Sequence, residues 1–493
     1  MDCHGAPGMQ KLMPEEAVAL IQPRDTVGIG GFTSAGAPST LGSALLAYAQ
    51  QCWKNGRPLA LNIITGASTL SSIDGGLAEC NGIRTRSPYQ ADRLLRQKIN
   101  DESVRFWDFH LSDFPQALRS GIWGPIDFAL IEAESVDLQG RIILTSGVGI
   151  TPTLCHLAKK IIVELRDDST MQFQGIHDIY EVRLPPRTLP IPLTQVAQRI
   201  GTEYVQVDPH KIVGVVQGNR PREHAILDHP TPESNRIGEH ILRFFAMETH
   251  LGRFPKTLLP LQVGVGNVAN ALMQRLTEVD GPQYEVYSEV LQDAIIEGVL
   301  SGRIRMASGG AFAVTKSCFQ TMRTHWETLR VKTLLRPQEI TNHPEIIRRL
   351  GIIAINTALE VDLWGNVNST HVCGRQMMNG IGGSGDFARN AYLTIFATPS
   401  TAKNGAISAI VPLCSHVDHI DHDVDVVVTE YGLADLRGKT PRERAVCIIE
   451  NCAHPNYREA LQACITSDRA HIPIDLSQAH RFHLNFLEQG KML

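Results

Sequence analysis

The stretch Leu-Gln-Val-Gly-Val-Gly-Asn-Val-Ala-Asn at residues 261–270 carries the signal that decides the fold. A short apolar strand runs into a glycine turn, and a segment with helical character follows. Glycines let the backbone approach a ligand closely, and the N–H groups at a helix start favour a phosphate or a developing oxyanion. Taken alone, the stretch is explained equally well by a tight strand-to-helix turn without a ligand.

Outward from this stretch, apolar runs of strand length alternate with segments of helical periodicity. Near-continuous hydrophobic strands separated by helices indicate mostly parallel sheets covered on both faces. The sequence therefore predicts an α/β fold with two doubly wound, mostly parallel open-sheet domains. The predicted strands are 26–29, 59–65, 126–133, 161–165, 204–208, 211–216, 258–263, 284–289, 352–356, 407–413 and 424–429, and the predicted helices are 39–55, 89–100, 193–200, 236–250, 268–276, 292–301, 442–451 and 457–466.

A polar segment at residues 218–235 interrupts this alternation. It contains Pro221, Pro230 and Pro232 and shows little apolar periodicity, which is typical of a linker. We expect an N-terminal α/β domain over residues 1–220 and a C-terminal α/β domain over residues 221–493.

The composition is that of a globular protein. The 493 residues are 43% hydrophobic and 20% charged, and 46 Lys+Arg against 51 Asp+Glu leave a formal net charge of −5. Such a balance creates no field that would gather nucleic acid or an anionic membrane. Ten scattered cysteines without a Cys-x-x-Cys pair indicate reduced thiols, and no apolar run reaches the length of a membrane span. We expect a cytoplasmic protein.

The segment Tyr-Ser-Glu-Val at 287–290 ends the strand predicted after the glycine turn. In a dinucleotide-binding unit, an acidic residue at this spacing holds the ribose hydroxyls, as in an NAD-dependent oxidoreductase. Alternatively, Glu289 is a nucleophile. Ligands bind at the carboxyl edge of open sheets, and there the carboxylate would lie beside the glycine amides. A third interpretation makes Glu289 a cap for the helix that follows.

A second glycine cluster favours the nucleophile. Four glycines fall within the six positions 380–385, and such a loop loses much conformational entropy on folding. It is suited to supply an amide to an oxyanion hole. A further cluster at residues 28–31 lacks the Lys-Ser/Thr of a Walker loop and is better explained as a turn between strand and helix.

Histidine and aspartate alternate at residues 416–423. Zinc and iron sites use these ligands, but the spacing is not that of a metal-binding helix. We expect polar side chains in a loop between strands and no metal.

Several motifs recur in one order along the chain. They are 263–271, 287–290, Asn342 with 344–351, 365–370, 379–390, 400–403, 416–419 and 429–438. In these motifs the sequence resembles the acetyl-CoA hydrolase/transferase family of class I CoA-transferases. The resemblance covers nearly the whole chain and is densest between residues 260 and 456.

The resemblance implies a CoA-transferase of two α/β domains that moves coenzyme A between short-chain carboxylic acids, of the propionyl-CoA:succinate or succinyl-CoA:acetate type. By that similarity, Glu289 attacks the acyl-CoA thioester, a mixed anhydride forms, and the returning thiolate leaves a glutamyl-CoA thioester. Acyl-CoA is then a substrate, and no tightly bound cofactor or metal is implied. The family is usually dimeric, so a homodimer is expected.

The resemblance also assigns residues. The N–H groups of Val265 and Gly383 would form the oxyanion hole. Residues that would contact CoA are Gly264, Val265, Gly266, Asn267, Val268, Asn379, Gly383 and Lys403. Glu430 matches a carboxylate near the family's active site, and Arg222 lies close to the position of an arginine that pairs with a substrate carboxylate, with an alignment uncertain by one residue.

Three alternatives stay open at this point. Acetyl-CoA hydrolysis differs only in whether water reaches the glutamyl thioester. An NAD-dependent oxidoreductase would use residues 264–269 with Glu289, but leaves the loop 380–385 without a role. An acyl-CoA sensor or a subunit of a larger lyase complex would share the scaffold without turnover by the isolated chain.

Overall fold

The computed structural model describes residues 9–166, 171–186, 189–226, 230–264, 266–278 and 281–493. By its internal contacts the chain divides into two compact units. Unit 1 comprises Met1–Ile226, Val286–Leu300 and Arg305–Ile346, and unit 2 comprises Leu227–Glu285, Ser301–Ile304 and Ile347–Leu493. Glu289 therefore belongs to unit 1, together with the first part of the chain.

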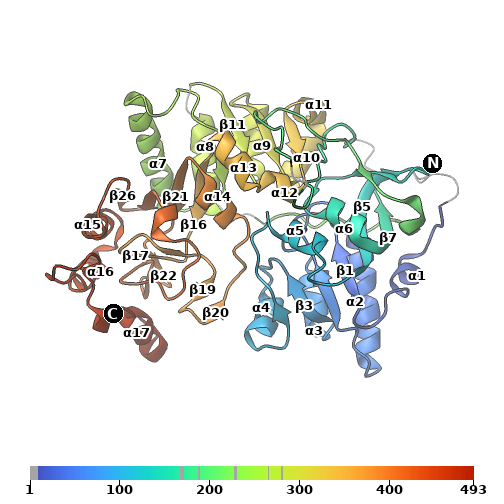
Figure 1. Cartoon of the computed structure of the whole chain (residues 1–493), viewed down its shortest axis with the longest axis horizontal. Coiled ribbons are helices and arrows are strands. Elements are labelled where there is room, and N and C mark those ends of the chain that lie inside the picture. The colour runs from blue at the N-terminus through green and yellow to red at the C-terminus, as the bar shows by residue number, and fades with distance from the viewer. Residues whose placement is uncertain (1–8, 167–170, 187–188, 227–229, 265, 279–280) are drawn as a thin grey trace. The chain divides into compact units, whose positions relative to one another are not determined.

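Unit 1 is built on a nine-stranded sheet (Figure 1). Seven strands follow the order β4-β3-β2-β1-β5-β6-β8, while β7 pairs with β5 and β9. The pairs β5–β6 and β6–β8 are antiparallel, and the pairs of β1 with β2 and β5, of β5 with β7 and of β7 with β9 are parallel. The strands are β1 (Thr26–Ile29), β2 (Leu61–Ile64), β3 (Ile83–Ser87), β4 (Arg105–Phe106), β5 (Ile126–Val136), β6 (Arg141–Leu144), β7 (Ala158–Leu165), β8 (Val205–Gln206) and β9 (Ile212–Gln217).

Helices cover both faces of this sheet. On β1, Val27 and Ile29 share a hydrophobic core with Leu41 of α2. Successive strand residues point to opposite faces, and the intervening Gly28 lies against Leu154 of α6, where a Cβ would come within 2.7 Å of the leucine side chain. The helices are α1 (Pro14–Val18), α2 (Ser39–Lys54), α3 (Leu77–Glu79), α4 (Arg93–Asn100), α5 (Phe114–Arg119) and α6 (Thr151–Leu157).

Residues 284–341, most of which belong to unit 1, form short strands joined by helices. Strand β12 pairs in parallel with β14, and β13 pairs in parallel with β15. The elements between residues 284 and 341 are β11 (Tyr284–Tyr287), β12 (Val290–Leu291), α9 (Asp293–Leu300), β13 (Ile304–Gly309), β14 (Ala311–Phe312), α10 (Lys316–Thr324), α11 (Trp326–Arg330), β15 (Thr333–Leu335) and α12 (Gln338–Thr341).

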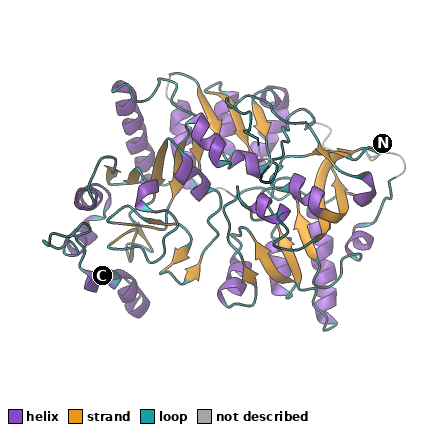
Figure 2. Cartoon of the chain, viewed as in Figure 1, coloured by secondary structure: helices purple, strands orange, loops and turns teal. Residues whose placement is uncertain are grey.

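In unit 2, strands of a second, mostly parallel sheet follow the order β10-β16-β21-β25-β26. The first four strands are parallel, and β26 returns antiparallel to β25. Helices again alternate with these strands (Figure 2). The elements are α7 (Pro232–His250), β10 (Leu261–Val263), α8 (Asn267–Glu278), α13 (Pro344–Leu350), β16 (Ile353–Thr357), α14 (Ser384–Asn390), β21 (Leu393–Ala397), β25 (Val426–Thr429), β26 (Gly432–Asp435), α15 (Pro441–Cys452), α16 (Pro455–Gln462) and α17 (Arg481–Gln489).

Small sheets lie between the main strands of unit 2. A three-stranded sheet has the order β18-β17-β24, and two hairpins pair β19 with β20 and β22 with β23. Val361 of β17 and Ile410 of β24 belong to one core with Ala445 and Ile448 of α15. The bounds are β17 (Glu360–Asp362), β18 (Val367–Asn368), β19 (His371–Val372), β20 (Gln376–Met377), β22 (Thr401–Ala402), β23 (Ile407–Ser408) and β24 (Ile410–Val411).

The predicted α/β class with two mostly parallel sheets is confirmed, and the predicted strands 26–29, 126–133 and 424–429 correspond to β1, β5 and β25. The predicted helix at residues 193–200 is wrong, because this segment is irregular. The Arg336 guanidinium donates hydrogen bonds to the carbonyl groups of Val196 and Gln198. The Gln198 side chain in turn accepts from Thr194 N, so tertiary contacts replace helical bonds here.

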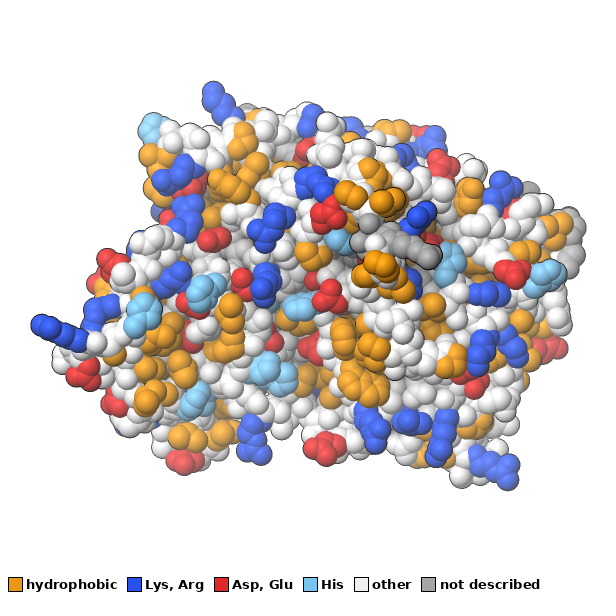
Figure 3. Space-filling view, in the orientation of Figure 1, with side chains coloured by type: hydrophobic (Ala, Val, Ile, Leu, Met, Phe, Trp, Pro, Cys, Tyr) orange, Lys and Arg blue, Asp and Glu red, His pale blue; other side chains and the backbone are white. Residues whose placement is uncertain are grey.

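Among the described residues, no helix is both long and apolar enough to cross a membrane. On the face drawn in Figure 3, lysine and arginine side chains are interspersed with aspartate and glutamate. This mixture agrees with the small net charge of −5.

Candidate active site

Glu289 lies two residues after the end of β11 and directly before β12. Its main-chain carbonyl accepts a hydrogen bond from Gly310 N at 2.8 Å, and the adjacent Val290 pairs with Ala311 of β14. A Cβ at Gly310 would lie 3.1 Å from the Glu289 carbonyl oxygen, so the two chain segments are in close contact. The backbone that carries the Glu289 side chain is therefore fixed from its neighbour strand.

The Glu289 carboxylate is held by an amide. Asn342 Nδ2 donates to Glu289 Oε2 at 3.1 Å, and Asn342 is fully buried. Thr341 Oγ1 donates to Asn342 Oδ1 at 2.7 Å, which orients the amide so that its NH₂ group faces the carboxylate. Glu289 itself is half-buried, so an oriented carboxylate belongs to a partly exposed residue.

The short helix α12 sets the position of Asn342. Gln338 N donates to Gly149 O at 2.9 Å, and Asn342 N closes the helical turn onto Gln338 O at 2.9 Å. Glu339 forms a buried ion pair with Arg119. Because α12 is tied to distant parts of unit 1, the amide is presented to Glu289 by a rigid element.

An apolar cluster lies beside Glu289, and Tyr89 packs against it. We call it the Val290 cluster; its buried members are Phe32, Ala35, Ala67, Leu111, Val290, Ala311 and Ala313. Burial raises the pKa of Tyr89, and the charges of Glu289 and Asp108 raise it further. The phenol therefore stays protonated at neutral pH and lies within the electrostatic reach of Glu289.

The first glycine turn lies at the carboxyl end of β10 in unit 2. Gly264 N donates to Ile355 O of the neighbouring strand β16 at 2.8 Å. Gly266 has a φ of 125°, a conformation that glycine adopts without strain, and α8 begins at Asn267. Val268 is buried, and Val265, whose amide is predicted to line the oxyanion hole, lies outside the described residues.

The second glycine cluster leads into α14 of unit 2. Gly382 has a φ of 60°, and Gly383 is the residue before the first residue of α14. Asn379, predicted to contact CoA, donates through Nδ2 to Gly380 O at 2.9 Å. Its side chain thus also supports the loop that carries Gly383.

Glu430 and Lys403 are two further predicted residues of unit 2. Glu430 follows β25, and Lys403 lies beyond β21, the strand that pairs in parallel with β25. Glu430 accepts hydrogen bonds from Ser400 N at 2.8 Å and from the Ser400 hydroxyl. Lys403 lies in the turn between β22 and β23, with its Nζ 4.9 Å from the centre of the Phe486 ring. Gly264, Glu430 and Ser400 all follow carboxyl ends of parallel strands, the edge at which open sheets bind ligands.

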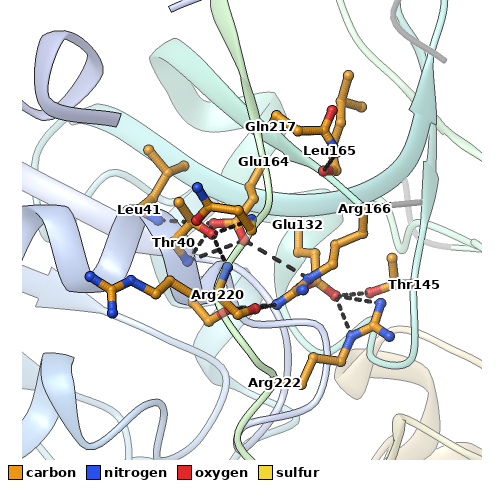
Figure 4. A network of polar contacts seen from close by, with 12 residues as sticks. Thr40, Leu41, Glu132, Thr145, Glu164, Leu165, Arg166, Gln217, Arg220 and Arg222 are labelled. Atoms are coloured by element: carbon orange, nitrogen blue, oxygen red, sulfur yellow. Dashed lines mark hydrogen bonds and ion pairs between the residues drawn. The ribbon is translucent and has the colours of Figure 1, made fainter. Parts of the chain in front are cut away.

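Arg222 lies in unit 1 within a network of buried charges (Figure 4). Its Nε and Nη2 are each 3.4 Å from Glu132 Oε1, and its guanidinium stacks 5.5 Å from the centre of the Phe319 ring. Arg166 Nε donates to the other oxygen of Glu132 at 2.9 Å. Burial acts to raise the pKa of Glu132, but the charges of Arg222 and Arg166 hold it below its ordinary value.

A second carboxylate extends this network. Glu164 accepts hydrogen bonds from Thr40 N and Leu41 N, each 2.9 Å from its Oε2, and so binds the start of α2. Burial and the charge of Glu132 raise the pKa of Glu164. Figure 4 shows both carboxylates directed toward Arg166.

The histidine-aspartate segment forms local polar contacts. Asp418 accepts from Ser369 N at 2.6 Å and from the Thr370 hydroxyl, while His416 Nε2 lies 3.2 Å from Asp418. Across the described ranges, no group of three or more His, Cys, Asp or Glu side chains is arranged to hold a metal ion.

Sequence reasoning assigned no role to Asn342 or Tyr89. Asn342 was visible only as part of a family motif, and its contact with Glu289 depends on chain packing across 53 residues. Tyr89 gave no signal, because a single tyrosine after a strand is common.

Known proteins resemble this chain over nearly its whole length. The propanoyl-CoA:succinate CoA transferase of Escherichia coli (strain K12) is 43% identical over 485 residues, which cover 98% of this chain and 99% of that protein. The succinyl-CoA:acetate CoA-transferase of Clostridium kluyveri is 43% identical over 97% of this chain and 89% of its own length. The acetyl-CoA hydrolase of Schizosaccharomyces pombe is 39% identical over 97% of this chain and 95% of its own length.

Solved structures share the fold. RipA from Yersinia pestis matches with a TM-score of 0.69 at 23% identity, covering 92% of this chain and 96% of RipA. The 4-hydroxybutyrate CoA-transferase from Porphyromonas gingivalis matches with a TM-score of 0.61 at 19% identity, with the same coverage of 92% and 96%.

Family models complete the comparison. One described as the acetyl-CoA hydrolase/transferase N-terminal domain matches residues 8–217, and one described as the C-terminal domain matches residues 319–465. Together with the relatives at 43% identity, these matches show that the chain belongs to the acetyl-CoA hydrolase/transferase family, whose enzymes act on acyl-CoA substrates.

Proposed function

We propose that this chain is a CoA-transferase that moves coenzyme A between short-chain carboxylic acids through a glutamyl-CoA thioester on Glu289. The observation that carries the proposal is the half-buried Glu289 between β11 and β12, whose carboxylate is oriented by the buried amide of Asn342. An oriented carboxylate on a partly exposed residue is suited to attack an acyl carbon, and covalent catalysis divides one difficult transfer into two easier steps.

In the first half-reaction, a Glu289 oxygen attacks the acyl-CoA carbonyl carbon and the C–S bond breaks, which gives a mixed anhydride and the CoA thiolate. The thiolate then attacks the glutamyl carbonyl carbon, and the C–O bond breaks to release the first acid. The glutamyl-CoA thioester that remains reacts with the acceptor acid in the reverse order. The thioester energy is conserved, and neither ATP nor a metal enters the balance.

Each step passes through an oxyanion, and the proposal assigns the N–H groups of Val265 and Gly383 to stabilise it. One such donor typically changes the rate by about 10²–10³-fold. Residues proposed to contact CoA are Gly264, Val265, Gly266, Asn267, Val268, Asn379, Gly383 and Lys403. Support comes from the glycine turns themselves, since Gly266 and Gly382 adopt positive φ and Gly383 precedes α14.

The acid pairs proposed are propionate with succinate or acetate with succinate, on the names of the two relatives at 43% identity. Arg222 is bound to Glu132 within unit 1, so recognition of a dicarboxylate by this arginine requires a change in that ion pair. The proposal includes a cytoplasmic homodimer, on the family resemblance and on the nine free cysteines among the described residues.

Acetyl-CoA hydrolysis at the same site is the second candidate, since relatives near 40% identity carry the name acetyl-CoA hydrolase. The NAD-dependent oxidoreductase interpretation is not retained, because family membership accounts for the glycine turn and Glu289 by acyl-CoA chemistry. An inert acyl-CoA sensor is likewise not retained, since the relatives at 43% identity are enzymes.

The test is mass spectrometry of the protein after incubation with propionyl-CoA or succinyl-CoA. A CoA-sized adduct is expected on the peptide that contains Glu289, and Glu289→Ala is expected to lose both the adduct and the transfer. The matched control is Glu297→Ala, a change at an exposed carboxylate on α9, which should keep both. Full activity in Glu289→Ala would reject the mechanism.

A further inference from the structure

Tyr89 is a half-buried tyrosine beside the candidate nucleophile, and its hydroxyl makes no hydrogen bond to any residue that the structure describes. Its ring packs against the Val290 cluster, which includes the residue next to Glu289. The Glu289 charge contributes to the raised pKa of this phenol. A protonated donor with no hydrogen-bond partner among the described residues thus lies beside the cluster that adjoins the candidate nucleophile.

We propose that the Tyr89 hydroxyl binds the carboxylate of the acid that accepts CoA, and thereby determines whether the glutamyl-CoA thioester is passed to an acid or to water. The inference rests on the proposed function. It concerns the choice between the two activities for which the relatives are named.

The surroundings of Tyr89 explain why a donor is needed there. The side chains of the Val290 cluster, such as Phe32, Ala67 and Leu111, are apolar and offer no hydrogen bond. Moving a carboxylate from water to such an apolar surface is unfavourable unless a hydrogen-bond donor contacts it there. The Tyr89 hydroxyl supplies that donor from the edge of the cluster.

The chemistry requires an acid to be held but makes no such demand on water. An acceptor carboxylate oxygen attacks the Glu289 carbonyl carbon, the C–S bond breaks, and CoA leaves as the thiolate with the electron pair. The thiolate then attacks the acyl carbon of the anhydride, and the C–O bond breaks to restore the Glu289 carboxylate. No proton is gained or lost, so Tyr89 acts as a hydrogen-bond donor and keeps its proton. Hydrolysis of the thioester by water involves no incoming carboxylate and does not need this donor.

The test uses the full-length enzyme with a preformed glutamyl-CoA thioester. The thioester is allowed to react with water alone or with increasing succinate or acetate, and its loss is followed by mass spectrometry in wild type and Tyr89→Phe. We expect the rate constant with acid to fall by roughly 10- to 100-fold, the effect of one hydrogen bond to a charged group, while hydrolysis is unchanged. The matched control is Tyr392→Phe in unit 2, whose side chain is 60% exposed, and it should behave as wild type.

The outcomes separate the role of Tyr89 from the proposed function of Glu289. An unchanged ratio of acid transfer to hydrolysis in Tyr89→Phe overturns the role of Tyr89, while the adduct on Glu289 still supports the proposed function. Absence of the adduct in the wild-type enzyme overturns the proposed function itself. Should Tyr89→Phe fail to fold, Tyr89→His, which keeps a donor, is compared with Tyr89→Leu, which does not; equal ratios in these two variants also overturn the role of Tyr89.

Discussion

Glu289 and Glu132 are both carboxylates of unit 1, on or directly after strands, yet their surroundings differ. Glu132 is fully buried and is bound by two guanidinium groups, those of Arg166 and Arg222. Glu289 is half-buried, and the neutral amide of Asn342 donates a hydrogen bond to its carboxylate. The two side chains thus share their chemistry but not the charge of these partners.

Under the proposed function, Glu132 is a structural carboxylate and Glu289 a reactive one. Despite the opposing effect of burial, the two arginines lower the pKa of Glu132, so this group is stabilised as an anion and is a weak nucleophile. At Glu289, the neutral amide of Asn342 orients the carboxylate. We therefore expect loss of Glu132 to affect stability and loss of Glu289 to affect activity.

The largest effect is expected from Glu289→Gln. Removal of a covalent nucleophile typically lowers kcat by about 10⁴–10⁶-fold. Steady-state transfer from propionyl-CoA to succinate should show this loss, while the urea midpoint stays close to that of wild type. Exposed Glu297→Gln on α9 is the control. A stable Glu289→Gln enzyme that transfers CoA at the wild-type rate would show that Glu289 is not the nucleophile.

Glu132→Gln should act on stability instead. The substitution removes the carboxylate that Arg166 and Arg222 share, and breaking a buried ion pair in this way costs about 3–5 kcal/mol. Urea unfolding followed by circular dichroism measures this change, and Glu203→Gln at an exposed site is the control. If Glu132→Gln lowers the free energy of unfolding by less than the control does, the charges around Glu132 do not stabilise unit 1.

Asn342→Ala is expected to have a smaller effect on activity. It removes one hydrogen bond to a charged group, worth about 1.5–3 kcal/mol, so kcat should fall roughly 10- to 100-fold. The rate of glutamyl-CoA formation in a single turnover is the readout, and Asn55→Ala on the surface is the control. An unchanged rate would show that the amide is not needed to orient Glu289.

The smallest effect expected is on pH dependence. Because the folded chain holds the pKa of Glu132 below its ordinary value of 4.5, the ionised group stabilises the fold above that value. This contribution is lost as the pH falls toward the folded-state pKa. The difference in unfolding free energy between wild type and Glu132→Gln should therefore shrink as the pH is lowered from neutral through the ordinary pKa of a glutamate. A difference that grows on acidification would contradict this assignment.

The sequence predicts what depends on neighbouring residues. Apolar β-branched runs locate β1, β5 and β25, and the glycines at 264 and 266 mark the end of β10. The position of Glu289 two residues beyond β11 follows from the same local pattern. Hydrophobic patterning acts over a few residues, so these features are readable without a structure.

Other features depend on chain packing. Asn342 reaches Glu289 because α12 is held by Arg119 and Gly149, and no local pattern encodes these contacts. Residues 193–200 have helical periodicity, but Arg336 binds their carbonyl groups and the segment stays irregular. Arg222 similarly meets Glu132 across 90 residues. Long-range polar contacts of this kind override local propensity.

The most direct test of the central claim follows an oxygen atom. The enzyme is given unlabelled acyl-CoA and succinate labelled with oxygen-18 in both carboxylates. The mass of the peptide that contains Glu289 is then measured by mass spectrometry. Attack of the acid on the glutamyl thioester places one acceptor oxygen in the Glu289 carboxylate when the anhydride is cleaved, so the account predicts oxygen-18 in this peptide. Full transfer with no label in the peptide would contradict it.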